Sequence, residues 1–184
     1  IRQMGDKIES RKIAIKTGIP TVPGIEEPIQ EFKMANKIAN EIGYPIMLKA
    51  SAGGGGRGIR VVPDKSQLKD ALKTCILEAE SSFGDGRIFI EKFIVNPRHI
   101  EIQILADMFG NIIHLGEREC SIQRRHQKII EESPSIRIDD ATREKLTSAA
   151  VSIAEKIKYS SAGTVEFLFD DNTGEFWFLE MNTR

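Results

Sequence analysis

A glycine-rich segment between two apolar runs constrains this chain more than any other feature. Residues 49–58 read KASAGGGGRG, between a predicted strand at 45–50 and another at 59–62. A strand follows the glycines where the dinucleotide-binding fingerprint requires a helix, and no Gly-Lys-Ser/Thr ends the segment as a P-loop requires. The sequence therefore predicts two strands joined by a flexible glycine loop.

This loop is a candidate phosphate-binding flap. Glycines permit positive φ and carry no Cβ, so backbone N–H groups can approach an anion closely. Lys49 and Arg57 add positive charge at its two ends. A mobile loop without a ligand is the alternative, and the flanking cations favour phosphate.

The charge balance excludes some classes of partner. The 184 residues include 26 Lys and Arg against 27 Asp and Glu, a net charge of −1. Generic nucleic-acid binding requires an excess of positive charge. No apolar run reaches the roughly 18 residues of a membrane-spanning helix, and the first residues lack the apolar region of a signal peptide. We expect an intracellular protein with no nucleic-acid or membrane partner and with reduced thiols at Cys75 and Cys120.

Hydrophobic periodicity predicts an α+β fold with antiparallel hairpins rather than regular βαβ alternation. Glycines end several of the apolar patterns, as at Gly18, Gly43 and Gly84. Helices are expected at 6–17, 30–42, 66–82 and 141–158, and further strands at 87–92, 99–106, 112–115, 163–169 and 175–182.

The last two strands form a predicted hairpin that carries acidic residues. If Phe169 pairs with Glu175, Glu166 lies opposite Phe178 and Thr164 opposite Glu180. Period-two alternation then places Phe176, Phe178, Glu180 and Asn182 on one face. Glu166 and Glu180 become diagonal neighbours within reach of one cation.

Two carboxylates close together repel each other, so a cation is expected between them. The oxygens of Glu166, Glu180 and Asn182 suit Mg²⁺ or Mn²⁺ better than Zn²⁺. A salt bridge to Arg or Lys is the alternative.

Two further segments carry charge. Residues 117–128 are densely charged, which is typical of a solvated face, but the apolar pair that follows favours a cleft. There Arg124, Arg125, His126 and Lys128 could hold a small anion. The apolar run at 89–94 is interrupted by Glu91 and Lys92 and suggests a hinge or pocket edge. His99 alone indicates no more than a structural histidine.

Six segments carry a family resemblance over nearly the whole chain: 4–7, 49–58, 91–92, 96–103, 117–128 and 180–184. In order and spacing they resemble the biotin carboxylase family of ATP-grasp enzymes. Residues 6–10, 82–85 and 158–163 are most similar to its acyl-CoA carboxylase branch, with propionyl-CoA as the expected acyl substrate.

The resemblance implies an ATP-grasp fold that holds MgATP between two antiparallel sheets. Residues 1–20 would be a linker helix, 21–93 the small lid domain and 94–184 an incomplete large domain. The implied reaction is ATP-dependent carboxylation of biotin on a carrier domain, with bicarbonate activated as carboxyphosphate. Its partners would be the carrier domain and a carboxyltransferase subunit, in bacterial cytoplasm or the mitochondrial matrix.

The resemblance also implies roles by position. ATP phosphates would contact Lys7, Lys49 and the backbone of Gly55 and Gly56. Adenine would contact Glu91, Lys92, Phe93 and Ile94, and His99, Gln123 and His126 would surround the nucleotide. Lys128 would bind bicarbonate, Arg184 the reacting anion, and Glu166, Glu180 and Asn182 the Mg²⁺ or Mn²⁺ ions.

Both ends of the chain look cut, so we expect a fragment of a longer protein. The family has a domain before this segment, and after it a general base for bicarbonate and an arginine facing biotin. Two alternatives stay open: another ATP-grasp ligase such as a carbamoyl-phosphate synthase, or a nucleotide-binding module without turnover.

Overall fold

The computed structural model describes residues 7–25, 27–29, 31–51, 58–124 and 127–184. The expected sites at Gly55, Gly56 and His126 lie outside these residues. The chain forms two compact units, one from Ile1–Thr21 with Asn96–Arg184 and the other from Val22–Val95. Helices and antiparallel sheets occur in both, so the predicted α+β class is confirmed.

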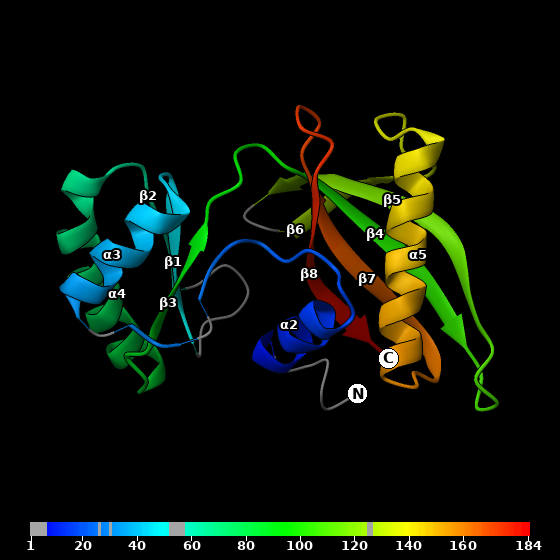
Figure 1. Cartoon of the computed structure of the whole chain (residues 1–184), viewed down its shortest axis with the longest axis horizontal. Coiled ribbons are helices and arrows are strands. Elements are labelled where there is room, and N and C mark those ends of the chain that lie inside the picture. Colours follow the sequence, from blue (N-terminus) through cyan, green and yellow to red (C-terminus); the bar gives the residue numbers. More distant parts are fainter. Residues whose placement is uncertain (1–6, 26, 30, 52–57, 125–126) are drawn as a thin grey trace. The chain divides into compact units, whose positions relative to one another are not determined.

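The unit of residues 22–95 is a three-stranded sheet packed against helices (Figure 1). Its strand order is β2-β1-β3, and both pairs are antiparallel. Apolar side chains at helical spacing, including Ile38 and Leu72, meet buried Leu48 and Ile90 of the sheet. Its elements are β1 (Ile46–Ala50), β2 (Ile59–Val62), β3 (Ile88–Lys92), α3 (Phe32–Ile42), the 3₁₀ turn Lys65–Gln67 and α4 (Leu68–Phe83).

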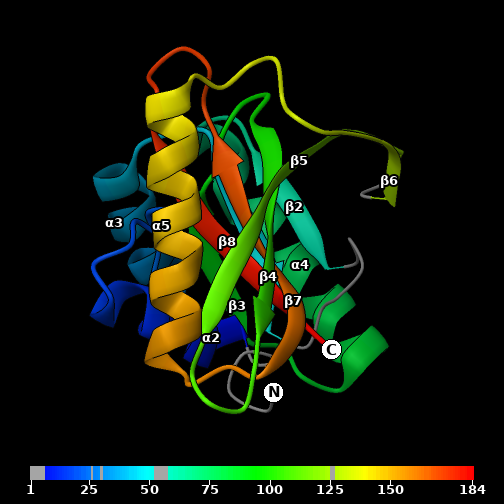
Figure 2. The same cartoon turned by 90° about the vertical axis from the view of Figure 1, so that its right-hand side faces the viewer.

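The other unit is built on a five-stranded antiparallel sheet of order β6-β5-β4-β7-β8. Figures 1 and 2 show α5 lying along one face of this sheet. On the same face α2 packs against β8 and α5. The elements are α2 (Lys7–Lys16), β4 (Arg98–Ala106), β5 (Ile112–Arg124), β6 (Gln127–Glu132), α5 (Asp140–Lys156), β7 (Ser161–Phe169) and β8 (Phe176–Thr183).

Alternation along β4 separates a core face from a polar face. Ile100, Ile102 and Ile104 are buried in the cluster that includes Leu146 and Ile153 of α5. The side chains between them, at 101 and 103, therefore point to the opposite face of the sheet. This opposite face carries the polar groups described below.

Over its described residues, 117–124 and 127–128, the charged segment is β-strand, so the strand predicted at 112–115 is longer than expected. β5 continues to Arg124 and pairs with β6, with register shifts along the pairing. Dense charge is typical of a solvated segment, but here other residues of the fold satisfy some of these charges. Glu117, for example, accepts hydrogen bonds from Arg143 Nε at 2.9 Å and from Ser135 N–H at 3.1 Å.

The predicted register of the last hairpin is wrong. Phe169 lies opposite Phe176, and Glu166 lies opposite Glu180 rather than Phe178. A turn closed by the Asp170 N–H bond to the Glu175 carbonyl shifts the pairing by one residue.

A register shift between the pairs Phe167–Phe178 and Glu166–Glu180 then leaves Leu179 without an opposite residue. This β-bulge changes which face the side chains occupy on its two sides. Phe178 lies in the helix-side core, with its ring 6.4 Å from that of Phe167. The expectation that Phe176 and Phe178 share a face with Glu180 and Asn182 is therefore wrong.

The cysteines Cys75 and Cys120 are both buried free thiols. Among the described residues, no helix has the length and apolar character needed to cross a bilayer.

Candidate functional site

Four charged residues form a row across four neighbouring strands on the polar face of the five-stranded sheet. Arg118 of β5 lies opposite Glu101 of β4, which lies opposite Glu166 of β7, which lies opposite Glu180 of β8. Directly opposed residues of antiparallel strands share one face of the sheet. Three carboxylates are thus next to one another, and two of them are strongly buried: Glu101 is 5% exposed and Glu166 7%.

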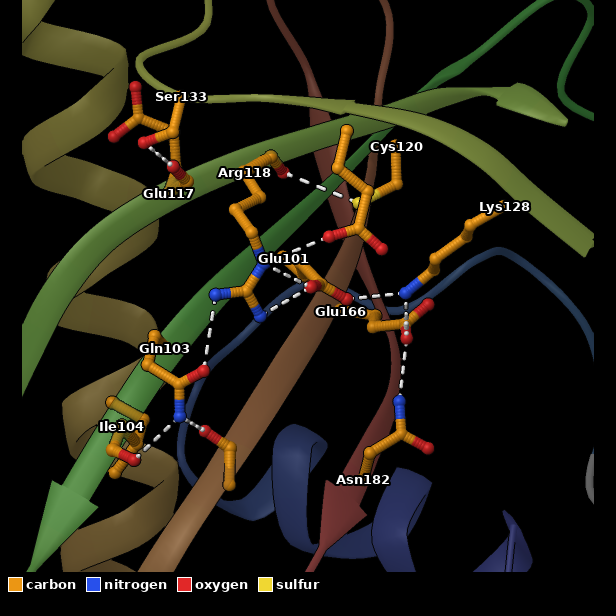
Figure 3. A network of polar contacts seen from close by, with 12 residues as sticks. Glu101, Gln103, Ile104, Glu117, Arg118, Cys120, Lys128, Ser133, Glu166 and Asn182 are labelled. Carbon is orange, nitrogen blue, oxygen red and sulfur yellow. Dashed lines mark hydrogen bonds and ion pairs between the residues drawn. The ribbon is translucent and has the colours of Figure 1, made fainter.

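Lys128, which reaches the row from β6, lies between two of these carboxylates (Figure 3). Its Nζ donates to Glu101 Oε2 and, at 2.6 Å, to Glu166 Oε1. Asn182 Nδ2 donates to the same Glu166 oxygen at 2.6 Å. The ammonium offsets the repulsion that two buried carboxylates would otherwise exert on each other.

On the other side of Glu101, Arg118 is held by a chain of hydrogen bonds (Figure 3). Arg118 Nε donates to Glu101 Oε1 at 2.6 Å, and Nη1 donates to Gln103 Oε1 at 3.1 Å. Gln103 Nε2 in turn donates to the Gly163 carbonyl at 2.9 Å. The Glu101 carboxylate is therefore fixed by the backbone of β7 through two intervening side chains.

These contacts shift the pKa values of Glu101 and Lys128. Burial by itself would raise the pKa of the Glu101 carboxyl, but hydrogen bonds and charge from Lys128 and Arg118 outweigh it and lower that pKa. Burial opposes the charged form of Lys128, but the Glu101 and Glu166 carboxylates raise its pKa above the ordinary value. At neutral pH Lys128 is a cation between anions.

The oxygens of Glu166, Glu180 and Asn182 suit a hard divalent cation. Glu166 and Glu180 are directly opposed, and Asn182 already contacts Glu166. The row holds three acidic groups against Arg118 and Lys128, which leaves one negative charge in excess. The donor set therefore fits Mg²⁺ or Mn²⁺, while Lys128 supplies the lysine contact that the alternative interpretation required.

A second grouping of possible ligands does not fit a metal. Ligand atoms of Glu101, Cys120 and Glu131 lie within 4.8 Å of one another. Burial, with the Glu101 charge, raises the pKa of the Cys120 thiol to about 12, so it stays protonated. The Glu101 oxygens are already engaged by Arg118 and Lys128.

The unit of residues 22–95 contains five of the expected nucleotide contacts among its described residues. Lys49 of β1 forms an ion pair with Glu91 of β3. Lys92 Nζ donates to the carbonyls of Gly43 and Tyr44 at 3.0 and 3.1 Å, which ties β3 to the turn after α3. Phe93 and Ile94 follow β3 and are partly buried.

The remaining expected residues, apart from those outside the described ranges, are spread over the larger unit. The His99 N–H donates to Ser121 Oγ at 3.1 Å, and Gln123 Nε2 donates to the Cys120 carbonyl at 2.8 Å. Arg184 is exposed, and its backbone N–H donates to the Tyr159 hydroxyl at 3.0 Å. Lys7 begins α2.

Sequence reasoning missed the roles of Glu101 and Arg118 in the row. Glu101 had only a weak signal, because it alternates with Ile100 and Ile102 in a strand that also carries Arg98, His99 and Gln103. Such a buried charge requires a cationic partner. The partner itself is set by strand register, which local pattern does not reveal.

Comparison with known proteins identifies relatives of the whole chain. The family model described as "Carbamoyl-phosphate synthase L chain, ATP binding domain" matches residues 6–184. The mitochondrial propionyl-CoA carboxylase alpha chain of Homo sapiens is 55% identical over 184 residues, which are 100% of this chain and 25% of that protein.

Solved structures agree with this result. The chain is similar to biotin carboxylase of Campylobacter jejuni in a β,γ-ATP complex, with a TM-score of 0.90 and 50% identity over 100% of this chain and 41% of that one. A second similar structure is the biotin carboxylase domain of Hydrogenobacter thermophilus 2-oxoglutarate carboxylase, solved with MgADP, ADP and bicarbonate. Its TM-score is 0.89, and it is 49% identical over 100% of this chain and 40% of that one. The chain thus spans less than half of each of these proteins.

Proposed function

The chain belongs to the family of the carbamoyl-phosphate synthase L chain ATP-binding domain, and from this premise we propose that it is the ATP-grasp part of a biotin carboxylase. The activity we propose for the whole protein is ATP-dependent carboxylation of biotin on a carrier domain, with bicarbonate activated as carboxyphosphate. Similarity to biotin carboxylases along the whole chain supports this assignment.

The observation that carries the proposal is the row Glu101–Glu166–Glu180 with Lys128 and Asn182 beside it. Glu166, Glu180 and Asn182 would hold Mg²⁺ or Mn²⁺, which would neutralise charge on the ATP phosphates. Lys128 lies next to Glu166 and would attract bicarbonate as a fixed cation. Arg184 would bind the reacting anion.

We assign the nucleotide contacts as the family resemblance implies. Lys49, now paired with Glu91, would turn toward the phosphates when ATP binds. Lys92 is held by two carbonyls, which fixes the chain at Phe93 and Ile94 where adenine would lie. Further contacts are proposed for Lys7, Gly55, Gly56, His99, Gln123 and His126.

For the whole protein we propose the context of its relatives. The carrier domain and a carboxyltransferase subunit would be its partners, and propionyl-CoA its final acyl substrate, since the propionyl-CoA carboxylase alpha chain is 55% identical. We propose that the protein is located in the bacterial cytoplasm or the mitochondrial matrix, because similar proteins include a mitochondrial and a bacterial one. Residues 21–93 would act as the lid and 94–184 as part of the large domain.

Calorimetric titration of MgATP tests the proposal. We expect saturable binding by the unaltered chain and at least about tenfold weaker binding by Glu166→Gln/Glu180→Gln, because neutral amides are poorer ligands for the metal. EDTA should have the same effect as the double variant. The exposed pair Glu144→Gln/Glu155→Gln on α5 is the matched control and should bind as the unaltered chain does.

Equal affinity in the double variant and the unaltered chain would contradict the assigned metal ligands. In the full-length protein, ATP cleavage that requires bicarbonate and rises with free biotin would support a biotin carboxylase. A rate of ATP cleavage that does not change when biotin is added would instead favour another ATP-grasp ligase.

A further inference from the structure

Glu101 is a buried carboxylate held by two cationic side chains. Arg118 binds one of its oxygens, with Nη2 and Nε at 2.5 and 2.6 Å, and Lys128 binds the other. The chain from Arg118 through Gln103 to the Gly163 carbonyl prevents the carboxylate from following Lys128 if Lys128 moves. Glu101 is thus a fixed anchor for the Lys128 ammonium.

Lys128 has a second anchor that conflicts with metal binding. Its Nζ lies 2.6 Å from Glu166 Oε1, which also accepts from Asn182 Nδ2. A divalent cation binds a carboxylate oxygen at roughly 2.0 to 2.6 Å, where an ammonium on the same oxygen would repel it strongly. Lys128 must therefore leave Glu166 Oε1 when a metal binds through that oxygen.

We propose that Glu101 is a positioning residue that retains the Lys128 ammonium when Glu166 takes up a divalent cation. The inference rests on the proposed function, because it takes Glu166 as a metal ligand. Glu101 would keep Lys128 beside the metal but off its ligand, where the lysine can meet an anion. Each gap in the row of carboxylates then has its own cation: Lys128 between Glu101 and Glu166, and the metal between Glu166 and Glu180.

This role makes an unusual prediction about metal affinity. In Glu101→Gln, the carboxylate left in contact with Lys128 is Glu166, so the ammonium competes with the metal there. Metal binding should weaken although Glu101 is not a ligand. Removing the ammonium as well, in Glu101→Gln/Lys128→Met, should restore the affinity because no competitor is left.

Titration of Mn²⁺ into the full-length protein without nucleotide, followed by the electron paramagnetic resonance signal of free Mn²⁺, measures this directly. We expect about tenfold weaker binding in Glu101→Gln, and binding by Glu101→Gln/Lys128→Met within about threefold of Lys128→Met alone. Glu117→Gln is the matched control: it removes a buried carboxylate paired with Arg143 on the helix side of the sheet, and it should leave Mn²⁺ affinity unchanged.

Steady-state kinetics supply the second measurement. At a divalent-cation concentration that saturates the metal site of the variant, Glu101→Gln should raise KM for bicarbonate about tenfold and leave KM for ATP within about twofold, because the remaining effect acts through Lys128. A merely structural role would lower the active fraction and leave both KM values unchanged. If Glu101→Gln does not fold, Glu101→Asp should show the same KM pattern. This variant keeps the carboxylate, but its side chain is one methylene shorter and holds the charge farther from Lys128.

The outcomes separate the inference from the proposed function. If Glu166→Gln/Glu180→Gln abolishes Mn²⁺ binding but Glu101→Gln binds Mn²⁺ normally, the inference fails and the metal site stands. If Glu101→Gln/Lys128→Met binds Mn²⁺ as weakly as Glu101→Gln does, Glu101 is itself a ligand or a structural group, and the inference also fails. If Glu166→Gln/Glu180→Gln binds Mn²⁺ like the unaltered protein, the metal site of the proposed function is wrong.

Discussion

Gly24 shows how a single residue constrains a proposed binding edge. It forms a bridge to Glu91, and the neighbouring Ile25 N–H donates to the Ile90 carbonyl at 3.1 Å. A Cβ at position 24 would lie 2.8 Å from the Ile90 carbonyl oxygen and 3.1 Å from Glu91 Cα. Both are backbone atoms of β3, so rotating a side chain cannot relieve the clash.

We therefore expect Gly24→Ala to lower the free energy of unfolding by about 1 to 3 kcal/mol. Gly86→Ala is the matched control, because its Cβ would meet atoms of the exposed Glu80 side chain, which can rotate away. That variant should stay within about 0.5 kcal/mol of the unaltered chain. Urea unfolding followed by circular dichroism measures both, and equal midpoints for the two variants would refute the close approach at Gly24.

At the scale of elements, residue types were easier to predict than register. The proposed oxygen ligands Glu166, Glu180 and Asn182 could be selected from sequence, since acidic and amide groups stand out in an apolar hairpin. Residues 176–179 are all apolar, however, so period-two alternation does not locate the extra residue at Leu179. Glu101 lies in the row because β4 pairs with β7, which is distant in sequence. No local sequence pattern encodes this pairing.

Besides the apolar side chains of the core, an ion pair joins α5 to its sheet. Arg143 Nε donates to Glu117 Oε1 at 2.9 Å, and the Glu117 side chain is only 2% exposed. Arg143→Met should cost about 3 kcal/mol of stability, because it leaves a buried carboxylate without its cation. Adding Glu117→Gln should recover much of that loss. Chemical denaturation of the two single variants and the double variant gives the coupling energy, and strictly additive losses would contradict the pairing.

At the scale of the whole molecule, the two units have separate cores. One buried cluster draws on residues between Ile25 and Ile90, and the other on residues 13–19 and 100–181. The unit of residues 22–95 is continuous in sequence, whereas the other is interrupted by it. The proposed metal ligands all belong to the interrupted unit, and Lys49 and Glu91 to the continuous one. We therefore expect the continuous unit, when it is separated from the rest of the chain, to fold but not to bind the metal.

We expect a peptide of residues 22–95 to fold by itself, since its helices and sheet bury a common set of apolar side chains. A domain of this size should unfold cooperatively with a free energy of no more than about 3 to 5 kcal/mol. It should bind no Mn²⁺, because Glu166, Glu180 and Asn182 are absent from it. Circular dichroism in urea and a Mn²⁺ titration check the two parts, with the complete chain as control. A peptide without a cooperative transition would show that this core depends on the rest of the chain, and a peptide that bound Mn²⁺ as tightly as the complete chain would place the metal elsewhere.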